Sequence, residues 1–420
     1  MIKILNTSNR NYLLNINKFL NYRRLKTRSN NFVVKKILND VKKNKIKALI
    51  KYEKKYSKNS RIRVNSKEIT QSIKKLSPKI KSSLDFAYKR IFNFHIKQKM
   101  KNVRYFDKYK NLLEYKIIPL NSVGIYVPSN LPSSLLMNAI PAKIAKVKRI
   151  VLANPRVDGK LNSAVMYVAR KLGIKEIFSM GGAQAIASLS YIQNVDKIVG
   201  PGNKFVSQAK LSLFGEIGIE SMIAGPSEIC VVADRNTNIN EISTSLIGQA
   251  EHDENSQCIL LTKDKLLIKK VIKRINIILK KIPRKFIASK SLRKNGLIIY
   301  VNEDKKIPEI INLISPEHLE INVKKPNKYL KKIVNAGSIC IGRYSAMAVT
   351  DYTAGTNHVL PTLGSAKFSS GLNVSEFYKK ISQIRLSKKG IEVIGKQAIN
   401  LAEYENLYGH AESIKSRMRR

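Results

Sequence analysis

The histidines of this 420-residue sequence are few and unevenly placed. Of the five, His252, His318, His358 and His410 all follow residue 250, each in a polar or glycine-rich context. The fifth, His95, lies among aromatic and apolar residues, where a packing or surface role is expected. Because imidazole titrates near neutral pH, it serves both as a general base and as a metal ligand. One such histidine would mean little, but four in this part of the sequence indicate a functional site.

Gln249 and His252 are a first candidate for a metal site. They end a predicted helix at positions i and i+3, so their side chains share one face. Glutamine is an unusual ligand, and on this pattern alone a structural role for the pair is the simpler alternative. Acidic residues are scarce in the sequence, yet Glu251, Asp253 and Glu254 gather here. Their negative charge favours the interpretation that this segment binds a cation.

The segment Ser315-Pro316-Glu317-His318 combines two potential proton acceptors. Ser315 as N-cap and Pro316 as first helical residue would start a helix, with Glu317 and His318 in its first turn. The positive end of a helix favours a carboxylate and disfavours an imidazolium. We therefore expect a neutral His318 beside an ionised Glu317, which places two candidate bases together. A capped helix without a chemical role is the alternative.

A glycine-containing turn, Gly200-Pro201-Gly202-Asn203, lies between a predicted strand and a predicted helix, where backbone N–H groups could face a phosphate. It is not the dinucleotide fingerprint G-x-G-x-x-G, so it supports nucleotide binding only weakly. The sequence has no P-loop, H-E-x-x-H or C-x-x-C motif. All three cysteines fall in predicted buried strands and are expected to pack as small apolar side chains: Cys230, Cys258 and Cys340.

Strands and helices that could position these residues alternate along the sequence. A helical region from about residue 30 to 100 comes first, with apolar residues at i, i+3 and i+4. Strand–turn–helix units then repeat, which is typical of parallel sheets covered by helices. The predicted strands are 123–127, 149–152, 174–179, 197–199, 228–233, 258–261, 297–301 and 338–341. The predicted helices are 134–147, 162–172, 183–191, one ending at 210, 241–252 and 266–281, and 373–420 should form a mainly helical tail.

Lysine and arginine outnumber aspartate and glutamate by 78 to 29, a formal net charge of +49. The excess is spread along the whole sequence, and lysine, asparagine and isoleucine all have A/T-rich codons. We interpret it as compositional drift without a specific nucleic-acid partner; a nucleic-acid-binding protein is the less favoured alternative. The absence of a long apolar run predicts no membrane-spanning helix, and so few cysteines fit a reducing compartment. A cytoplasmic location is therefore expected.

Several ordered segments together resemble the histidinol dehydrogenase family, from about residue 30 to the C-terminus. They are 181–187 (GGAQAIA), 200–203 (GPGN), 224–228 (AGPSE), 249–252 (QAEH), 316–320 (PEHLE) and 351–362 (DYTAGTNHVLPT). So many motifs in one order are very improbable by chance. The resemblance, rather than the spacing of residues, is what points to a substrate.

The resemblance implies that L-histidinol is oxidised to L-histidine in two NAD-dependent steps through an aldehyde. It implies a site for Zn²⁺ or Mn²⁺ made by Gln249, His252, Asp351 and His410. These four residues would contact the substrate together with His318, Ser227 and Glu405. His318 would take the hydroxyl proton, and Glu317 would activate water in the second oxidation. Three residues would lie beside NAD: Tyr126, Gln184 and Asn203.

The implied fold is α/β, with two Rossmann-like parallel-sheet domains, a helical N-terminal arm and a helical C-terminal tail, in an intertwined homodimer. We expect the arm at 1–25 and a first domain, with most site residues, at 26–125 plus 229–372. A second domain, on the NAD side, is expected at 126–228 and the tail at 373–420. In the family the tail completes the neighbouring site, so His410 and Glu405 of the partner subunit would serve each metal site.

Two departures from the family concern the NAD side. The loop after Pro128 is shorter than usual, with Ser129-Asn130-Leu131 in its place, and the stretch between Gln184 and Asn203 is also short. A weakened or inactive relative with decayed cofactor loops is therefore the main alternative to an active enzyme. Every residue that the resemblance assigns to metal binding or proton transfer is nevertheless present.

Overall fold

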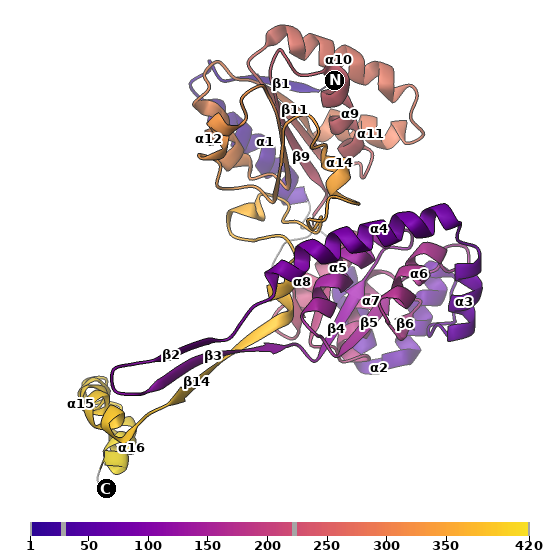
Figure 1. The fold of residues 1–420 in the computed structure, drawn as a ribbon. Helices are drawn as coiled ribbons and strands as arrows, with labels where there is room; N and C mark the ends of the chain where they lie inside the picture. Colours follow the sequence, from indigo (N-terminus) through magenta and orange to yellow (C-terminus); the bar gives the residue numbers. More distant parts are fainter. Residues whose placement is uncertain (1, 27–30, 221–224, 419–420) are drawn as a thin grey trace.

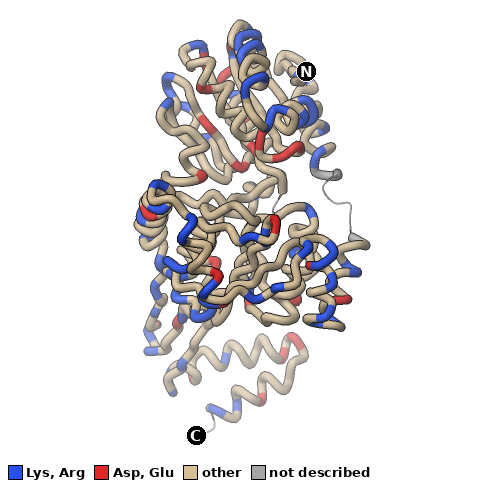
Figure 2. Tube along the Cα trace, turned by 90° about the vertical axis from the view of Figure 1, so that its right-hand side faces the viewer, with Lys and Arg blue, Asp and Glu red and all other residues tan. Residues whose placement is uncertain are grey.

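The computed structural model describes residues 2–26, 31–220 and 225–418 (Figure 1). These residues form two α/β halves, each built on a parallel sheet, and a long arm that ends in two helices. The predicted α/β class with two parallel-sheet units is confirmed. No described helix is both long and apolar enough to cross a membrane. Lysine and arginine residues are dispersed over both halves of the molecule (Figure 2), as their even spacing in the sequence predicts.

The lower half in Figure 1 contains a parallel sheet in the order β6-β5-β4-β7-β8. Its strands are β4 (Ser122–Tyr126), β5 (Arg149–Ala153), β6 (Glu176–Phe178), β7 (Lys197–Val199) and β8 (Gly218–Ile219). The helices between them are α5 (Pro132–Ile144), α6 (Ser163–Lys171), α7 (Gly182–Tyr191) and α8 (Lys204–Leu213). Three earlier helices pack on the same half: α2 (Asn31–Ser57), α3 (Ser66–Lys74) and α4 (Pro78–His95).

The upper half contains a parallel sheet in the order β1-β11-β10-β9-β12-β13. Its strands are β1 (Lys3–Asn6), β9 (Glu228–Ala233), β10 (Gln257–Thr262), β11 (Gly296–Tyr300), β12 (His318–Asn322) and β13 (Ser338–Ile341). Its helices are α1 (Tyr12–Lys26), α9 (Ile239–Ala250), α10 (Lys265–Leu279), α11 (Lys285–Asn295), α12 (Lys306–Ile314), α13 (Asn327–Leu330) and α14 (Met347–Thr350).

Strand β9 shows how this sheet is buried on both faces. Side chains alternate along a strand, so Ile229 and Val231 pack against α9, α10 and α11, while Cys230 and Val232 pack against α1 and α12. A strand covered on both faces reads as a continuous apolar run, which is why the sequence predicts it well. The three cysteines are buried and unpaired, as expected.

The N-terminal segments are distributed differently from the expected domain boundaries. Strand β1 pairs with β11, and α1 packs on α12, so residues 3–26 belong to the upper half rather than to a separate arm. Helices α2, α3 and α4 cover the lower half, whereas the sequence predicts that residues 26–125 belong to the unit that carries 229–372. An apolar helix face indicates that a helix is covered, but it does not indicate which sheet covers it.

Helices make up most of the described tail residues, as predicted for 373–420, but the arm also contains strands that the sequence does not predict. The arm begins with the antiparallel strands β2 (Val103–Phe106), β3 (Leu112–Pro119) and β14 (Tyr378–Arg385), in the order β14-β3-β2. Helices α15 (Lys388–Tyr404) and α16 (Tyr408–Met418) follow at its far end. Strand β14 forms because β3, far away in the sequence, supplies its hydrogen bonds, and such long-range pairing leaves no local signal. Short 3₁₀ helices complete the chain: η1 (Ile96–Gln98), η2 (Ser365–Lys367) and η3 (Val374–Phe377).

Candidate active site

Three of the four C-terminal histidines approach one another at the edge of the upper sheet where its strands begin. His318 is the first residue of β12, His252 follows α9, and His358 lies in the loop after α14. His318 Nε2 is 4.0 Å from Asp351 Oδ1, and the His358 ring nitrogen Nδ1 is 2.7 Å from the backbone oxygen of Asp351. His252 is close enough to lower the pKa of both other rings. The structure therefore gathers His252, His318, His358 and Asp351 in one place.

The prediction that Ser315-Pro316 starts a helix is wrong. Helix α12 ends here instead, with Ser315 in the left-handed conformation at φ 51° and its N–H bonded to the oxygen of Ile311. His318 then begins β12 and pairs with Ile229 and Ser338. Proline is common shortly after a helix as well as at its first position, so the same residues fit both ends of a helix.

Burial, rather than a helix end, sets the charge of the two candidate bases. His318 is 3% exposed, and desolvation lowers its pKa to about 3, so its imidazole is neutral as expected. Glu317 is also buried, and desolvation raises its pKa well above the ordinary range, with Glu228 and Asp351 adding to the rise. The expected ionised Glu317 is therefore not favoured by its surroundings. Glu317 Oε1 lies 3.9 Å from His318 Nε2.

His318 also has a free ring nitrogen. Its Nδ1 atom is buried and has no hydrogen-bond partner within the described residues. Its Nε2 atom lies 3.9–4.0 Å from the two carboxylates, which is beyond hydrogen-bond distance. A buried polar atom without a partner is costly, so an unpaired imidazole fits a group that a substrate would approach.

The chemistry of Gln249 and Asp351 fits a metal. Gln249 is 2% exposed, so its side-chain amide is held away from solvent. Desolvation raises the pKa of Asp351 to about 7. Buried oxygen donors of this kind, with the imidazole of His252 nearby, are the donors that zinc and manganese accept. Among the described residues of one chain, no three His, Cys, Asp or Glu side chains meet to hold a metal. Of the four predicted ligands, only His252 and Asp351 are of these types and lie at this edge of the sheet.

His410 and Glu405 do not join this group within one chain. His410 lies in α16 and Glu405 follows α15, at the far end of the arm and away from α14 (Figure 1). Both residues are exposed. Ser227 does lie near the group, since it directly precedes β9 and its backbone oxygen accepts the N–H of Gln257 at 2.9 Å. Ala224, the first residue of the AGPSE motif, lies outside the described residues.

Two of the three residues expected beside NAD, Gln184 and Asn203, line a cavity in the lower half. The cavity has a volume of about 320 Å³ and is lined by α2 and by the starts of α7 and α8. The third, Tyr126, is buried, and its hydroxyl oxygen accepts the N–H of Gly182, a residue that lines the cavity, at 3.4 Å. The cavity thus lies where two helices of the lower half begin, at Gly182 and Lys204.

The glycines of the 200–203 turn have a steric role. Gly200 has φ +112°, and a Cβ atom there would come within 2.1 Å of the backbone oxygen of Tyr126. Only glycine therefore lets this turn cross the end of β4. Asn203 caps α8 by accepting the N–H groups of Phe205 and Val206 at 3.0 and 3.2 Å. Those two N–H groups already have a partner, so they are not free to bind a phosphate as the sequence suggested.

Sequence reasoning missed three buried charged residues behind these two groups. Glu53 accepts the N–H of Gly181 and the side-chain amide of Gln184, both at 2.8 Å, and burial raises its pKa. Arg23 and Glu228 form a buried ion pair beside Glu317. Glu228 closes one of the motifs that carry the family resemblance, which was a usable signal. Nothing in the local sequence distinguishes Glu53 or Arg23 from their charged neighbours.

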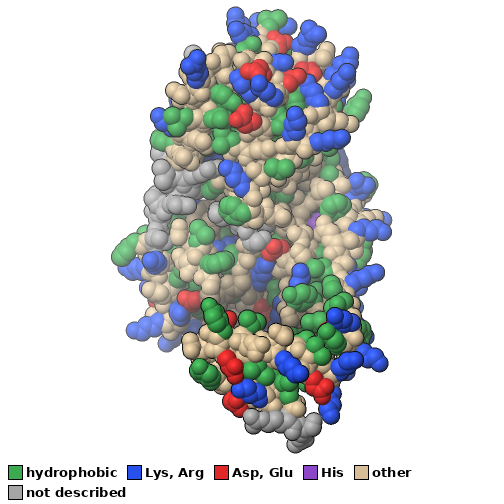
Figure 3. Space-filling view, turned by 90° about the vertical axis from the view of Figure 1, so that its left-hand side faces the viewer, with side chains coloured by type: hydrophobic (Ala, Val, Ile, Leu, Met, Phe, Trp, Pro, Cys, Tyr) green, Lys and Arg blue, Asp and Glu red, His purple; other side chains and the backbone are tan. Residues whose placement is uncertain are grey.

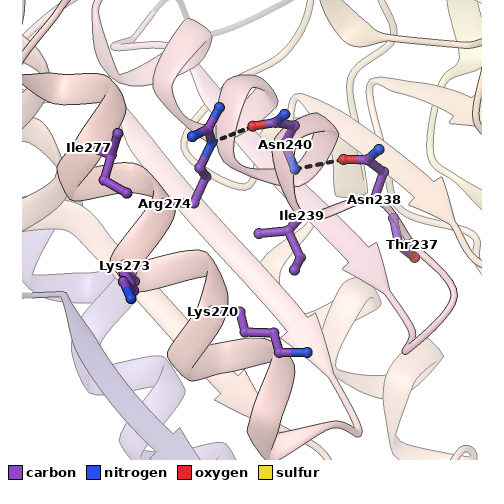
Figure 4. Close-up of a pocket in the computed structure, with 8 residues that line it drawn as sticks. All are labelled: Thr237, Asn238, Ile239, Asn240, Lys270, Lys273, Arg274 and Ile277. Atoms are coloured by element: carbon purple, nitrogen blue, oxygen red, sulfur yellow. Dashed lines mark hydrogen bonds between the residues drawn. The ribbon is translucent and has the colours of Figure 1, made fainter.

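A second cavity, of about 590 Å³, lies between α9 and α10 (Figure 4). Lys270, Lys273 and Arg274 of α10 line one side. Arg274 donates to the side chain of Asn240, whose N–H is accepted by the capping Asn238 at 2.8 Å. None of the predicted site residues lines this cavity.

The pKa of the partly buried His358 predicts that this residue makes a pH-dependent contribution to the free energy of unfolding. Burial lowers its pKa from 6.5 to about 4. At a pH between these two values, His358 is protonated in the unfolded chain but not in the folded chain. Its contribution to the free energy of unfolding therefore decreases as the pH falls. We expect the stability deficit of His358→Asn relative to wild type to shrink from about pH 7 to about pH 5 in urea unfolding. A deficit that stays constant or grows over this range would contradict the prediction.

Comparison with known proteins identifies the family. A family model described as histidinol dehydrogenase matches residues 21–418. The chain is 53% identical over 427 residues to histidinol dehydrogenase of Pelagibacter ubique (strain HTCC1062), with 100% of each chain covered. It is 40% identical to that of Hydrogenovibrio crunogenus (strain DSM 25203 / XCL-2), with 93% and 92% covered.

Solved structures agree. The crystal structure of histidinol dehydrogenase from Elizabethkingia anophelis matches with a TM-score of 0.91 at 34% identity, covering 100% of this chain and 98% of the other. An acetylating aldehyde dehydrogenase from Geobacillus thermoglucosidasius has a TM-score of 0.51 at 14% identity, covering 89% and 97%, and shares the fold alone. The chain therefore belongs to the histidinol dehydrogenase family of oxidoreductases.

Proposed function

We propose that the chain oxidises L-histidinol to L-histidine in two NAD-dependent steps through the aldehyde. The observation that carries the proposal is the buried pair Glu317–His318 beside Asp351. It places a neutral imidazole and a carboxyl group next to the carboxylate of Asp351, an oxygen donor suited to a divalent metal. Family membership supplies the identity of the substrate.

His318 is the base for the first oxidation. Burial lowers its pKa to about 3, so the ring is neutral over the whole physiological range and has an unprotonated nitrogen that can take the hydroxyl proton. It takes the proton of the substrate hydroxyl while the carbon that bears this hydroxyl gives a hydride to NAD, which yields the aldehyde and NADH. Proton and hydride together account for the two electrons and two hydrogens lost.

Glu317 serves the second oxidation. It takes a proton from the water that adds to the aldehyde, and the resulting hydrate gives its hydride to a second NAD. Its surroundings raise its pKa, which makes the carboxylate a stronger base once it is ionised. His318 and Glu317 are adjacent in the chain and only 3.9 Å apart between Nε2 and Oε1, so one bound substrate can use both.

Replacing Glu317 with glutamine separates the two steps. We expect Glu317→Gln to slow aldehyde oxidation by about 10²–10⁴-fold, the usual worth of a positioned base, and to slow alcohol oxidation much less. The two steps are measured separately by supplying histidinol or the aldehyde and recording NADH formation. Equal losses in both steps would contradict the division of roles between Glu317 and His318.

Gln249, His252 and Asp351, with His410 of the partner subunit, would hold the metal. When bound, zinc would act as a Lewis acid that holds the imidazole and amine of the substrate in place. Ser227 and Glu405 of the partner subunit would add contacts to the same substrate. The role of these residues is orientation, and holding a reactant in the productive geometry can account for a large part of a rate enhancement.

The arm supports a homodimer with shared sites. Its strands and helices carry large exposed hydrophobic side chains: Val103, Tyr105, Phe106, Ile384, Leu401 and Tyr404. Figure 3 shows hydrophobic side chains gathered on the lower part of the face that it draws. Exposed apolar groups that lie together mark a protein-binding surface. A second copy that covers this surface would bring His410 and Glu405 of the partner subunit to the metal site.

NAD would bind beside Tyr126, Gln184 and Asn203, at the cavity in the lower half. Figure 2 shows lysine and arginine dispersed over both halves, and we propose no specific nucleic-acid partner. Buried, unpaired cysteines fit a reducing compartment, and we propose a cytoplasmic location.

The proposal is tested by the stoichiometry of the reaction. Purified protein with histidinol, excess NAD and zinc should form two NADH for each histidine released, because the aldehyde is carried through both steps. One NADH per histidinol, with free aldehyde as the product, would contradict the two-step proposal. No NADH with any metal supplied would favour the alternative of an inactive relative.

A further inference from the structure

Arg23 connects the N-terminal helix to the candidate active site. It lies near the end of α1 and is 6% exposed. Its guanidinium donates to the carboxylate of Glu228, to the backbone oxygen of Pro226 and, at 3.0 Å, to that of Asn255. A guanidinium offers five donors in a rigid fork, so these bonds fix both its position and that of its partners.

Glu228 in turn holds Glu317 from two sides. The N–H of Glu228 donates to Glu317 Oε2 at 2.7 Å, and the N–H of Glu317 donates to Glu228 Oε2 at 3.3 Å. This reciprocal pair lies where β9 and β12 begin side by side. The other oxygen of Glu228 accepts from Arg23 and, at 2.9 Å, from the N–H of Leu363. Glu228 thus fixes both the carboxylate and the backbone N–H of Glu317, and Glu228 is itself held by Arg23 and by the N–H of Leu363.

The charges of this cluster require Arg23. Glu228 is 3% exposed and Glu317 is 6% exposed, so two carboxyl groups share one buried place. Among the described residues, Arg23 is the one lysine or arginine that pairs with either of them. A buried charge that loses its partner is strongly destabilised, and two nearby carboxylates repel each other. Without Arg23 the cluster would have to take up a proton or rearrange.

We infer that Arg23 is a positioning residue for the second oxidation: it holds Glu228, and Glu228 holds the carboxylate and the backbone of Glu317 beside His318. The inference rests on the proposed function, in which Glu317 acts on water in that step. It assigns an active-site role to α1, a segment that the sequence places more than two hundred residues from any base. Arg23 touches neither base, so its effect passes through Glu228.

The inference predicts a selective loss in Arg23→Met. Displacement of Glu317 should lower kcat for aldehyde oxidation about 10- to 100-fold more than kcat for alcohol oxidation, with smaller changes in KM, because a small misplacement of a reacting group has effects of this size. Arg23→Lys, which keeps the charge, should recover part of the loss. The double variant Arg23→Met/Glu228→Gln, which removes both charges, should also recover part of it.

The control is Lys18→Met, which replaces an exposed basic residue of the same helix. It should leave both steps unchanged. Equal losses in both steps for Arg23→Met, with no recovery in Arg23→Lys or in the double variant, would overturn the inference and leave Arg23 a structural role. The wild type is measured in parallel. An active wild type, with no selective loss in Arg23→Met, refutes the inference alone. An inactive wild type refutes the proposed function and the inference with it. If Arg23→Met does not fold, Arg23→Lys must still show the selective loss in a milder form, and wild-type behaviour of that variant counts against the inference.

Discussion

The variant His318→Asn should lose about 10²–10⁴ in kcat for histidinol oxidation, since a positioned general base contributes that much. The imidazole of His318 is neutral because burial lowers its pKa to about 3, and its Nδ1 has no partner among the described residues. Asparagine fills similar space and keeps a polar group, but it cannot accept a proton near neutral pH. The rate is measured as NADH formed from histidinol at saturating NAD.

A buried histidine outside the site provides the matched control. His95 is fully buried in α4, where its Nδ1 contacts the backbone oxygen of Ile91 at 2.9 Å and its Nε2 lies 3.2 Å from the amide of Asn357. His95→Asn should lower stability while the folded protein keeps a near-normal kcat. A His318→Asn enzyme that retains more than about a tenth of the wild-type kcat would contradict the assignment of the base.

Removal of the metal should abolish turnover almost completely. Gln249, His252 and Asp351 would then lose the ion that orients the substrate, and loss of orientation can cost many orders of magnitude in rate. The experiment compares chelator-treated protein, after removal of the chelator, with the same protein after addition of zinc or manganese. Activity should return with the metal.

Cofactor binding distinguishes this loss from unfolding. The cavity beside Gln184 and Asn203 lies in the lower half, whereas Gln249 and Asp351 belong to the upper half, so NAD affinity should change little when the metal is removed. Full turnover in protein shown to be metal-free would contradict the metal assignment. Loss of NAD binding together with turnover would indicate general unfolding rather than loss of substrate orientation.

Local patterns in the sequence predict much of the fold. The strands of both parallel sheets are short apolar runs that end at glycine, proline or polar residues, and burial on both faces makes that signal strong. What the sequence does not predict is pairing at long range. Strand β14 depends on β3, β1 depends on β11, and the choice of sheet for α2, α3 and α4 depends on packing that no local pattern records.

The candidate site shows the same division. The sequence groups four histidines into one site, and the structure brings three of them together, His252, His318 and His358. The fourth, His410, lies in α16 at the far end of the arm. The local argument for the charges of Glu317 and His318 used a helix that is not there, because Ser-Pro fits the end of a helix as well as its start. Arg23 and Glu53 could not be found, since their importance comes from burial beside distant residues.

Oxidation of histidinol at a metal site built from two copies of the chain is tested most directly with mixed dimers. His252→Ala and His410→Ala chains are each expected to form almost no NADH from histidinol, since each lacks one ligand at every site. A hybrid of the two chains has one site with both ligands intact. At that site His252 comes from the His410→Ala chain, and His410 of the partner subunit comes from the His252→Ala chain. Random re-association should therefore restore roughly a quarter of the wild-type rate. A mixture that exchanges subunits but stays inactive, or a His410→Ala protein with wild-type activity, would contradict a shared metal site.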